Sequence, residues 1–178
     1  AISAYQQAVK IKPNYPDALN NLGLALRKQG DLNSAIYSYK QALKYKPIYL
    51  EAHSNLGDAQ QEQSNLNAAV SSYQQALKLK PNFPEALVNL GLALQKLGDL
   101  HESISSFQQA LKLKPDFPEA HFNLANALQD QGNLNSAISF YKKALKYKPI
   151  YPEAHSNLGD AQQEQSNLNS AVSSYQQA

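Results

Sequence analysis

Five asparagines recur along the chain at one fixed interval, at Asn21, Asn55, Asn89, Asn123 and Asn157. A side-chain amide carries both donors and an acceptor, so it can pair with a peptide backbone whatever the side chains of that peptide. Packed helices lie about 10 Å apart, and an extended peptide advances about 3.3 Å per residue. Successive asparagines would then meet about every third residue of the peptide. The alternative interpretation is that these asparagines cap or bridge between adjacent repeats.

Three histidines share another position of the same period: His53, His121 and His155. Imidazole is a common metal ligand, but His53 and His121 are two periods apart, too far for one ion with bonds of about 2.1 Å. No Cys and no evident pair of carboxylates completes a set. We expect these histidines to fill packing positions and predict no metal site.

Catalytic motifs are missing from the sequence. There is no nucleophile–base pair, no phosphate-cradling loop and no zinc motif. A surface made of repeats also lacks the enclosed cleft that catalysis needs. We therefore expect a protein that is not an enzyme and that binds no cofactor.

The elements that position the asparagines are set by proline, which recurs at residues 13, 47, 81, 115 and 149. A fixed period of this length indicates stacked repeats, each burying its apolar face against its neighbours. We predict one array with full repeats at 16–49, 50–83, 84–117 and 118–151. A truncated repeat, 152–178, follows them, and the second helix of another, 1–15, precedes them.

Each unit is predicted to form two helices. The first begins at a proline such as Pro16 or Pro84, which is tolerated at the first helical position, and ends near Gly30, Gly98 or Gly132, which can take the left-handed conformation. Ser64 and Ser166 occupy the same place in two units and are followed by Asn65 and Asn167, so either these turns are strained or the asparagine takes the left-handed role. The second helix ends in a Lys-x-Lys pair that suits the helix dipole.

The packing positions alternate in size between the two helices, which favours interdigitated packing. The first helix supplies a leucine followed by a small residue, as in Leu22-Gly23 and Leu124-Ala125. The second helix supplies a large aromatic residue between small ones. The aromatic residues are Tyr39, Tyr73, Phe107, Tyr141 and Tyr175, and the small residues that follow are Ala42, Ala76, Ala110, Ala144 and Ala178.

This pattern resembles the tetratricopeptide repeat (TPR) over all 178 residues. The resemblance implies an all-α fold, an α-solenoid in which antiparallel helix pairs form a right-handed superhelix. One departure is the position of the usual Trp of the family. It is occupied by Leu19, His53, Leu87, His121 and His155.

The run from Ala110 to Leu124 is similar in style to the repeats of the O-GlcNAc transferase superhelix. In that family, asparagines one residue before the core leucine line the concave groove and hold extended peptides. The resemblance implies a peptide-binding groove here, but no catalytic domain. A second TPR mode, the two-carboxylate clamp, needs lysines where this chain has Asn20, Ser54, Val88, Phe122 and Ser156, so we do not expect it.

Polar residues one turn after the asparagines are expected to set specificity in the groove: Asp58, Asn126 and Asp160, with Leu24 and Leu92 in the other two units. Acids in the groove would favour a basic or polar extended ligand. The equally open alternative is that they are solvated charges.

Composition narrows the class of partner. The 16 basic and 14 acidic residues balance to +2, whereas a nucleic-acid groove needs a clustered excess of Lys and Arg. No apolar run approaches the roughly 20 residues that span a bilayer. We expect a soluble protein, with a cytoplasmic location favoured, and neither nucleic acid nor membrane as partner.

Residues 50–76 and 152–178 differ at only two places, Leu50 against Pro152 and Ala68 against Ser170. Surface positions match as well as core ones, which indicates recent duplication or design and a longer parent array. The absence of Met also indicates a portion of a longer protein. Because solenoids normally need polar capping helices, we expect the ends to be covered by further chain or by end-to-end self-association.

The predicted function is a non-catalytic scaffold that binds an extended polypeptide in its concave groove through the asparagine ladder, Asn21, Asn55, Asn89, Asn123 and Asn157. Two alternatives remain open. The first is a substrate-recognition arm of a larger enzyme, such as a glycosyltransferase resembling O-GlcNAc transferase. The second is a designed or structural array without a ligand.

Overall fold

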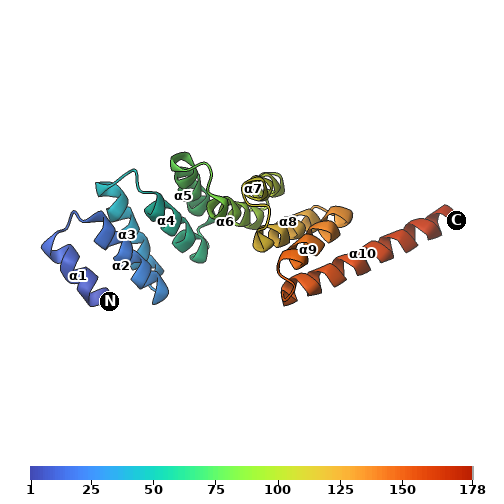
Figure 1. Ribbon diagram of the computed structural model, residues 1–178, viewed down its shortest axis with the longest axis horizontal. Helices are drawn as coiled ribbons and strands as arrows, with labels where there is room; N and C mark the ends of the chain where they lie inside the picture. Colours follow the sequence, from blue (N-terminus) through green and yellow to red (C-terminus); the bar gives the residue numbers. More distant parts are fainter. Residues whose placement is uncertain (178) are drawn as a thin grey trace. The chain divides into compact units, whose positions relative to one another are not determined.

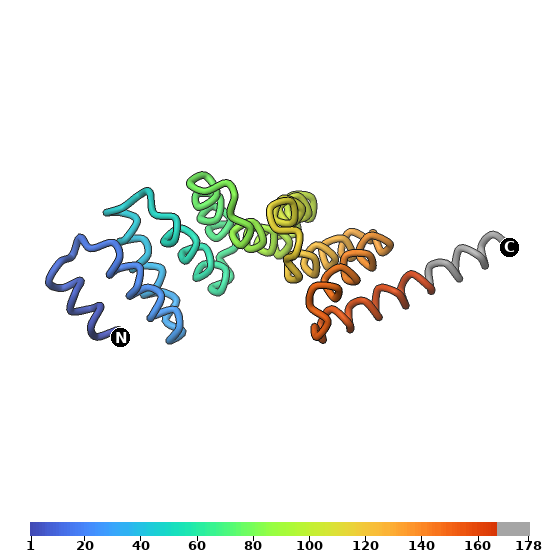
Figure 2. Tube along the Cα trace, viewed as in Figure 1, coloured from blue at the N-terminus to red at the C-terminus, as the bar shows by residue number. Residues whose placement is uncertain are grey.

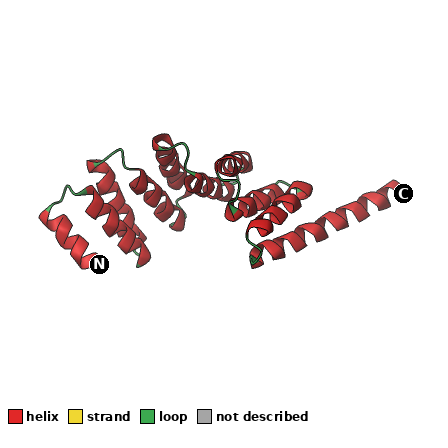
Figure 3. Cartoon of the chain, in the orientation of Figure 1, coloured by secondary structure: helices red, strands yellow, loops and turns green. Residues whose placement is uncertain are grey.

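The computed structural model describes the backbone of residues 1–177 and the side chains of residues 1–166. Figure 3 shows helices joined by short loops, and the described backbone contains no strand. The chain divides into two compact units, residues 1–97 and 98–178. No described helix is both long and apolar enough to cross a membrane.

The first unit contains six helices, which Figure 1 labels. They are α1 (Ile2–Ile11), α2 (Pro16–Lys28), α3 (Leu32–Tyr45), α4 (Leu50–Glu62), α5 (Leu66–Leu79) and α6 (Pro84–Lys96). Each helix packs on the next along the chain, and α4 also touches α2 and α6. The chain trace in Figure 2 reverses direction at each turn of this unit.

The second unit contains α7 (Leu100–Leu113), α8 (Pro118–Asp130), α9 (Leu134–Tyr147) and α10 (Pro152–Gln177). Its consecutive helices are again in contact, and α8 also touches α10. In both units the even-numbered helices correspond to the predicted first helices, and the odd-numbered ones to the second. The predicted all-α solenoid of helix pairs is therefore confirmed within each unit.

Helix ends follow the expected local chemistry. Proline opens α2, α6 and α8 at the first helical position, where its missing N–H costs nothing. Gly30, Gly98 and Gly132 take φ values of 88°, 85° and 80°, as expected for a residue that ends an α-helix in the left-handed conformation. Ser64 takes the same conformation with φ 63°, so the strained turn predicted there is confirmed.

The equivalent turn predicted at Ser166 is wrong, because α10 runs through this residue as continuous helix. A non-glycine residue in the left-handed region costs about 1–2 kcal/mol, and the Gln165-Ser166-Asn167 sequence contains no glycine. At Ser64 that cost is offset by α5, which packs on both α4 and α6. The predicted packing positions of the last second helix, Ala171, Tyr175 and Ala178, lie outside the residues whose side chains are described.

Buried rings of the second helices form the core, and in two pairs of the first unit the ring lies against a glycine of the first helix. Tyr39, Phe107 and Tyr141 are fully buried, and Tyr73 is 1% exposed. A Cβ added at Gly57 would lie 2.6 Å from Tyr73 Cε1, and the same holds for Gly23 and Tyr39. Glycine is therefore needed at these two positions, because no side chain fits between ring and helix. The predicted alternation of large and small residues is confirmed.

The turn between pairs is closed by a lysine over an aromatic ring. Lys46 Nζ lies 4.0 Å from the centre of the Tyr49 ring, and Lys148 Nζ lies 4.2 Å from that of Tyr151. The same lysines pair with an acid of the preceding first helix, at 3.9 Å to Asp17 and 3.4 Å to Glu119. These lysines thus stabilise the turn through the aromatic ring and the acid as well as through the helix dipole.

Candidate functional site

The predicted ladder asparagines all lie on even-numbered helices, α2, α4, α6, α8 and α10. Asn21 is exposed, whereas the side chains of Asn55, Asn89, Asn123 and Asn157 are half-buried. An amide so placed can touch the neighbouring repeat and still face solvent.

Two of these asparagines are held by the preceding repeat through the same contact. Asn89 Nδ2 donates to Asp58 Oδ1 at 3.0 Å, and Asn157 Nδ2 donates to Asn126 Oδ1 at 2.9 Å. In both cases the acceptor belongs to the polar position of the preceding first helix. The structure therefore brings the ladder asparagines Asn89 and Asn157 into contact with Asp58 and Asn126, the predicted groove residues one turn after the asparagine of the preceding repeat. For one N–H of each of these two amides, the bridging interpretation holds.

Asn55 uses a different acceptor, because Leu24 stands where the polar residue would be. Its Nδ2 donates to Asn20 Oδ1 at 3.1 Å instead. Asn20 is buried and was considered in the sequence only as a departure from the carboxylate clamp. Asn21, its exposed neighbour, makes no side-chain hydrogen bond to the described part of the chain.

The core tyrosines take part in the same networks. Tyr73 Oη donates to Asp58 Oδ1 at 2.9 Å, and Tyr141 Oη donates to Asn126 Oδ1 at 2.6 Å. In both cases the acceptor lies on the first helix of the same pair. Asp58 and Asn126 thus each join the tyrosine of their own pair to the ladder asparagine of the next pair.

Tyr39 shows what happens without that acceptor. Leu24 stands where Tyr73 has Asp58 and Tyr141 has Asn126, and the Tyr39 hydroxyl is buried without a hydrogen-bond partner. Burial is the main cause that raises the pKa of Tyr39 to about 12 and that of Tyr141 to about 12. Burial, followed by the charge of Asp58, also raises the pKa of Tyr73.

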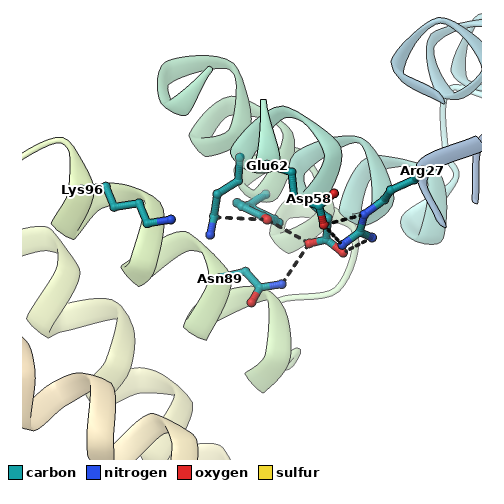
Figure 4. A pocket seen from close by; sticks show the side chains of 7 residues that line it. Arg27, Asp58, Glu62, Asn89 and Lys96 are labelled. Atoms are coloured by element: carbon teal, nitrogen blue, oxygen red, sulfur yellow. Dashed lines mark hydrogen bonds and ion pairs between the residues drawn. The ribbon is translucent and has the colours of Figure 1, made fainter. Parts of the chain in front are cut away.

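Arg27 of α2 joins the first network from the other side, as Figure 4 shows. Its Nη1 donates to Asp58 Oδ2 at 2.9 Å, and its Nε and Nη2 donate to Glu62 Oε1 at 2.9 and 2.7 Å. Burial lowers the pKa of Arg27, but Glu62 and Asp58 together outweigh that effect and raise it. Asp58 is thus fully paired, and its charge is compensated within the protein.

A pocket of about 210 Å³ opens beside this network. It is lined by Arg27, Asp58, Gln61, Glu62, Tyr73, Asn89 and Lys96. Lys96 is exposed and makes no ion pair within the described residues (Figure 4). The Lys96 ammonium and the remaining donor and acceptor of Asn89 are among the polar groups that this pocket leaves available.

The other predicted groove residues, Asp160 and Asn123, do not belong to either hydrogen-bond network within the described part of the chain. Asp160 is exposed on α10 and makes no hydrogen bond to the described residues. Asn123 lies half-buried on α8. The residues missed as site residues are Tyr73 and Tyr141, because a large aromatic residue in a repeating core position indicates packing and hides the role of its hydroxyl.

The histidines share one contact that the sequence did not reveal. The Nε2 atoms of His53, His121 and His155 lie 3.0, 2.8 and 3.0 Å from the carbonyl oxygen of the repeating proline before each of them. Because a carbonyl only accepts, Nε2 carries the proton in each case. His121 is buried as expected, but His53 is half-buried and His155 exposed, so these two mainly fix the turn. In the described part of the chain no three ligating side chains converge on one point.

Comparison with protein families gives a match along most of the chain. A family model described as TPR repeat matches residues 1–29, 23–64, 61–98, 96–132 and 125–166. No curated protein matches the sequence. The helix pairs and their period are thus the features that the chain shares with known proteins.

Several solved structures are similar. The crystal structure of MamA is 28% identical and superposes with a TM-score of 0.80, covering 83% of this chain and 86% of MamA. TTC0263, a thermophilic TPR protein of Thermus thermophilus, is 26% identical with a TM-score of 0.70, covering 90% and 88%. YrrB, a TPR protein with an unusual peptide-binding site, is 22% identical with a TM-score of 0.78, covering 94% and 86%.

Proposed function

The chain belongs to the TPR family, whose fold is suited to protein interaction, and we propose that it binds an extended polypeptide along its first helices. The asparagine ladder makes the contacts, each amide pairing with a peptide group of the ligand. The bound partner is recognised mainly by its backbone. The chain acts as a scaffold and carries out no reaction on the partner.

The observation that carries this proposal is the way the amides are held. Asn55, Asn89 and Asn157 each donate one N–H to the preceding repeat. At Asn55 and Asn89, Oδ1 accepts no hydrogen bond from the described residues, and a second N–H remains. One donor and one acceptor, held in a fixed orientation, match the N–H and C=O of a peptide group.

The spacing supports an extended ligand. Within the first unit, Asn55 and Asn89 stand on α4 and α6, and α4 and α6 are in contact. Helices in contact lie about 8–10 Å apart, and a strand advances about 3.3 Å per residue. Successive asparagines are therefore spaced to meet peptide residues about three apart.

Charge contributes little to recognition in this proposal. The sequence left open whether groove acids favour a basic ligand. Both carboxylate oxygens of Asp58 accept hydrogen bonds, from Arg27, Tyr73 and Asn89. Asp58 therefore presents no uncompensated negative charge to a ligand. Lys96 is the nearby group that can meet a carbonyl or carboxylate of the ligand.

YrrB shows that an array with this fold is compatible with a peptide-binding site. At 22% identity the likeness concerns the fold alone, so the site proposed for this chain depends on its own asparagines. The interaction surface lies on the even-numbered helices. Peptide binding at this surface depends neither on self-association of the chain nor on a larger parent protein.

The test is a selection from a random peptide library with a triple variant, Asn55→Ala, Asn89→Ala and Asn123→Ala. Each lost hydrogen bond costs about 0.5–1.5 kcal/mol, so the affinity for selected peptides should fall by at least about tenfold. The matched control changes three exposed asparagines away from the ladder, Asn14, Asn67 and Asn82, to Ala. Equal affinity of the ladder variant and the control would overturn the proposal.

A further inference from the structure

The pair formed by α8 and α9 departs from the other units at two positions of its second helix. Phe140 stands where α3, α5 and α7 have Ser38, Ser72 and Ser106, and Lys143 stands where they have Gln41, Gln75 and Gln109. These serines are tied inward: Ser38 donates to Ser34 O, and Ser72 donates to Gln60 Oε1. In so regular an array, two neighbouring exceptions on one helix indicate a local specialisation.

Both exceptions line a pocket of about 410 Å³ in the second unit. Its walls come from Gln108, Leu111 and Lys112 of α7, Pro115 in the turn after α7, His121 and Leu124 of α8, and Phe140, Lys143 and Tyr147 of α9. His121 and the ladder residue Asn123 are two positions apart on α8, which is about 200° around a helix. The pocket therefore lies on a different face of α8 from the ladder.

Aromatic rings form one wall of this pocket. The His121 ring stacks on Tyr147 at 5.5 Å and 10°, and lies 5.9 Å from Phe140 at 27°. The bond from His121 Nε2 to Pro115 O fixes the ring plane. Burial lowers the pKa of His121; the hydrogen bond to Pro115 opposes this effect and Lys143 adds to it, and the net shift favours the neutral ring. Together these rings offer a flat apolar surface.

Two cations stand at the same pocket. Lys143 Nζ lies 4.3 Å from the centre of the Phe140 ring, and Lys112 comes from α7. Both side chains are exposed, and no acid lines the pocket among the described residues. An apolar surface flanked by unneutralised positive charge is complementary to an apolar group that carries an anion.

We propose that this pocket binds the C-terminal residue of a partner polypeptide, with an aromatic or large aliphatic side chain against Phe140, Tyr147 and His121 and the α-carboxylate between Lys112 and Lys143. The walls favour a chain end over a passing segment. Backbone groups inside helices are already hydrogen-bonded to one another, so the walls offer no backbone partners to a segment that crosses the pocket. A chain end brings one apolar side chain and one carboxylate instead.

The first experiment uses a fluorescein-labelled hexapeptide, Gly-Ser-Gly-Ser-Gly-Phe, with a free C-terminus, followed by fluorescence anisotropy on the whole chain. We expect saturable binding, weakened at least about tenfold when the C-terminus is amidated, because the charge that the lysines meet is then lost. Replacing the last residue by Ala should weaken binding to a similar extent. No saturable binding up to about 1 mM, or equal binding of the amide, overturns the proposal.

The second experiment restores the residues of the other units with Phe140→Ser and Lys143→Gln. Both changes are expected to fold, because the other second helices carry these residues. Each should weaken binding of the free-acid peptide about fivefold or more. Gln75→Lys, which adds a lysine at the equivalent place on α5, should leave binding unchanged. Unchanged affinity of Phe140→Ser and Lys143→Gln contradicts the assignment. If Phe140→Ser alters the circular dichroism melt, the exposed Lys143→Gln decides.

Discussion

Asn89 on α6 donates its side-chain amide to Asp58 Oδ1 on α4 at 3.0 Å. The same oxygen accepts from the Tyr73 hydroxyl at 2.9 Å, so one carboxylate connects three helices of two successive pairs. Asn126 does the same for Tyr141 and Asn157 in the second unit. The residue column that orients the asparagines is therefore also the one that satisfies the buried tyrosines.

The first prediction compares two tyrosines at equivalent positions. Tyr73→Phe removes a buried hydrogen bond and should lower the free energy of unfolding by about 1 kcal/mol. Tyr39→Phe removes a hydroxyl that has no partner, so it should be neutral or slightly stabilising. Urea denaturation of both variants tests this. A larger loss for Tyr39→Phe than for Tyr73→Phe would contradict the assigned network.

A second prediction concerns the acceptor missing beside Tyr39. Leu24→Asn places an amide oxygen before Tyr39 at the same offset at which Asn126 stands before Tyr141. We expect the gain of a hydrogen bond to raise the free energy of unfolding by about 1 kcal/mol, measured by urea denaturation. In the Tyr39→Phe background the gain should shrink. Equal effects in both backgrounds would show that the hydroxyl is not the group being satisfied.

The turn at Ser64 gives a third prediction. Its φ of 63° is strained for any residue with a Cβ, so Ser64→Gly should stabilise the protein by about 1 kcal/mol. Gly30→Ala is the opposite control, because φ is 88° there, and it should destabilise. Thermal melts followed by circular dichroism measure both. A destabilising Ser64→Gly would mean that the serine side chain matters more than its backbone.

Alkaline pH should unfold the protein through its buried tyrosines. Burial raises the pKa of Tyr141 from 10.0 to about 12, so above pH 10 the unfolded chain ionises this group while the folded chain does not. The stability contributed by the neutral phenol is complete below pH 10 and is lost as the pH rises toward 12. Tyr141→Phe should shift the alkaline unfolding midpoint, followed by circular dichroism, to higher pH. An unshifted midpoint contradicts this role.

Much of the fold could be predicted because one sequence period repeats the same physical signals. Proline at the first helical turn, glycine at φ 88° and a ring against Gly23 each recur where the period places them. The turn at Ser166 could not be predicted from local sequence. The same residues form a turn at Ser64, where α5 packs on both of its neighbours.

The asparagine positions could be predicted, but their partners could not. Whether an amide meets Asp58, Asn126 or Asn20 depends on which residue of the preceding repeat is polar. One signal was present in the sequence. Tyr73 follows Asp58 and Tyr141 follows Asn126 at the same offset, whereas Phe107 follows Leu92 at that offset. A tyrosine at the aromatic position of the second helix thus accompanies a hydrogen-bond acceptor 15 residues earlier on the first helix, and Tyr39 is the exception.

The central claim is that ladder asparagines pair with the backbone of a bound peptide, and a double-mutant cycle tests it most directly. Isothermal titration calorimetry would compare one selected peptide and its singly N-methylated forms, on the unchanged chain and on Asn89→Ala. N-methylation removes a backbone donor, so at one peptide position its effect should vanish in Asn89→Ala, with a coupling of about 1 kcal/mol. In Asn55→Ala the coupled position should lie about three residues away along the peptide. Additive effects at every position would contradict the claim.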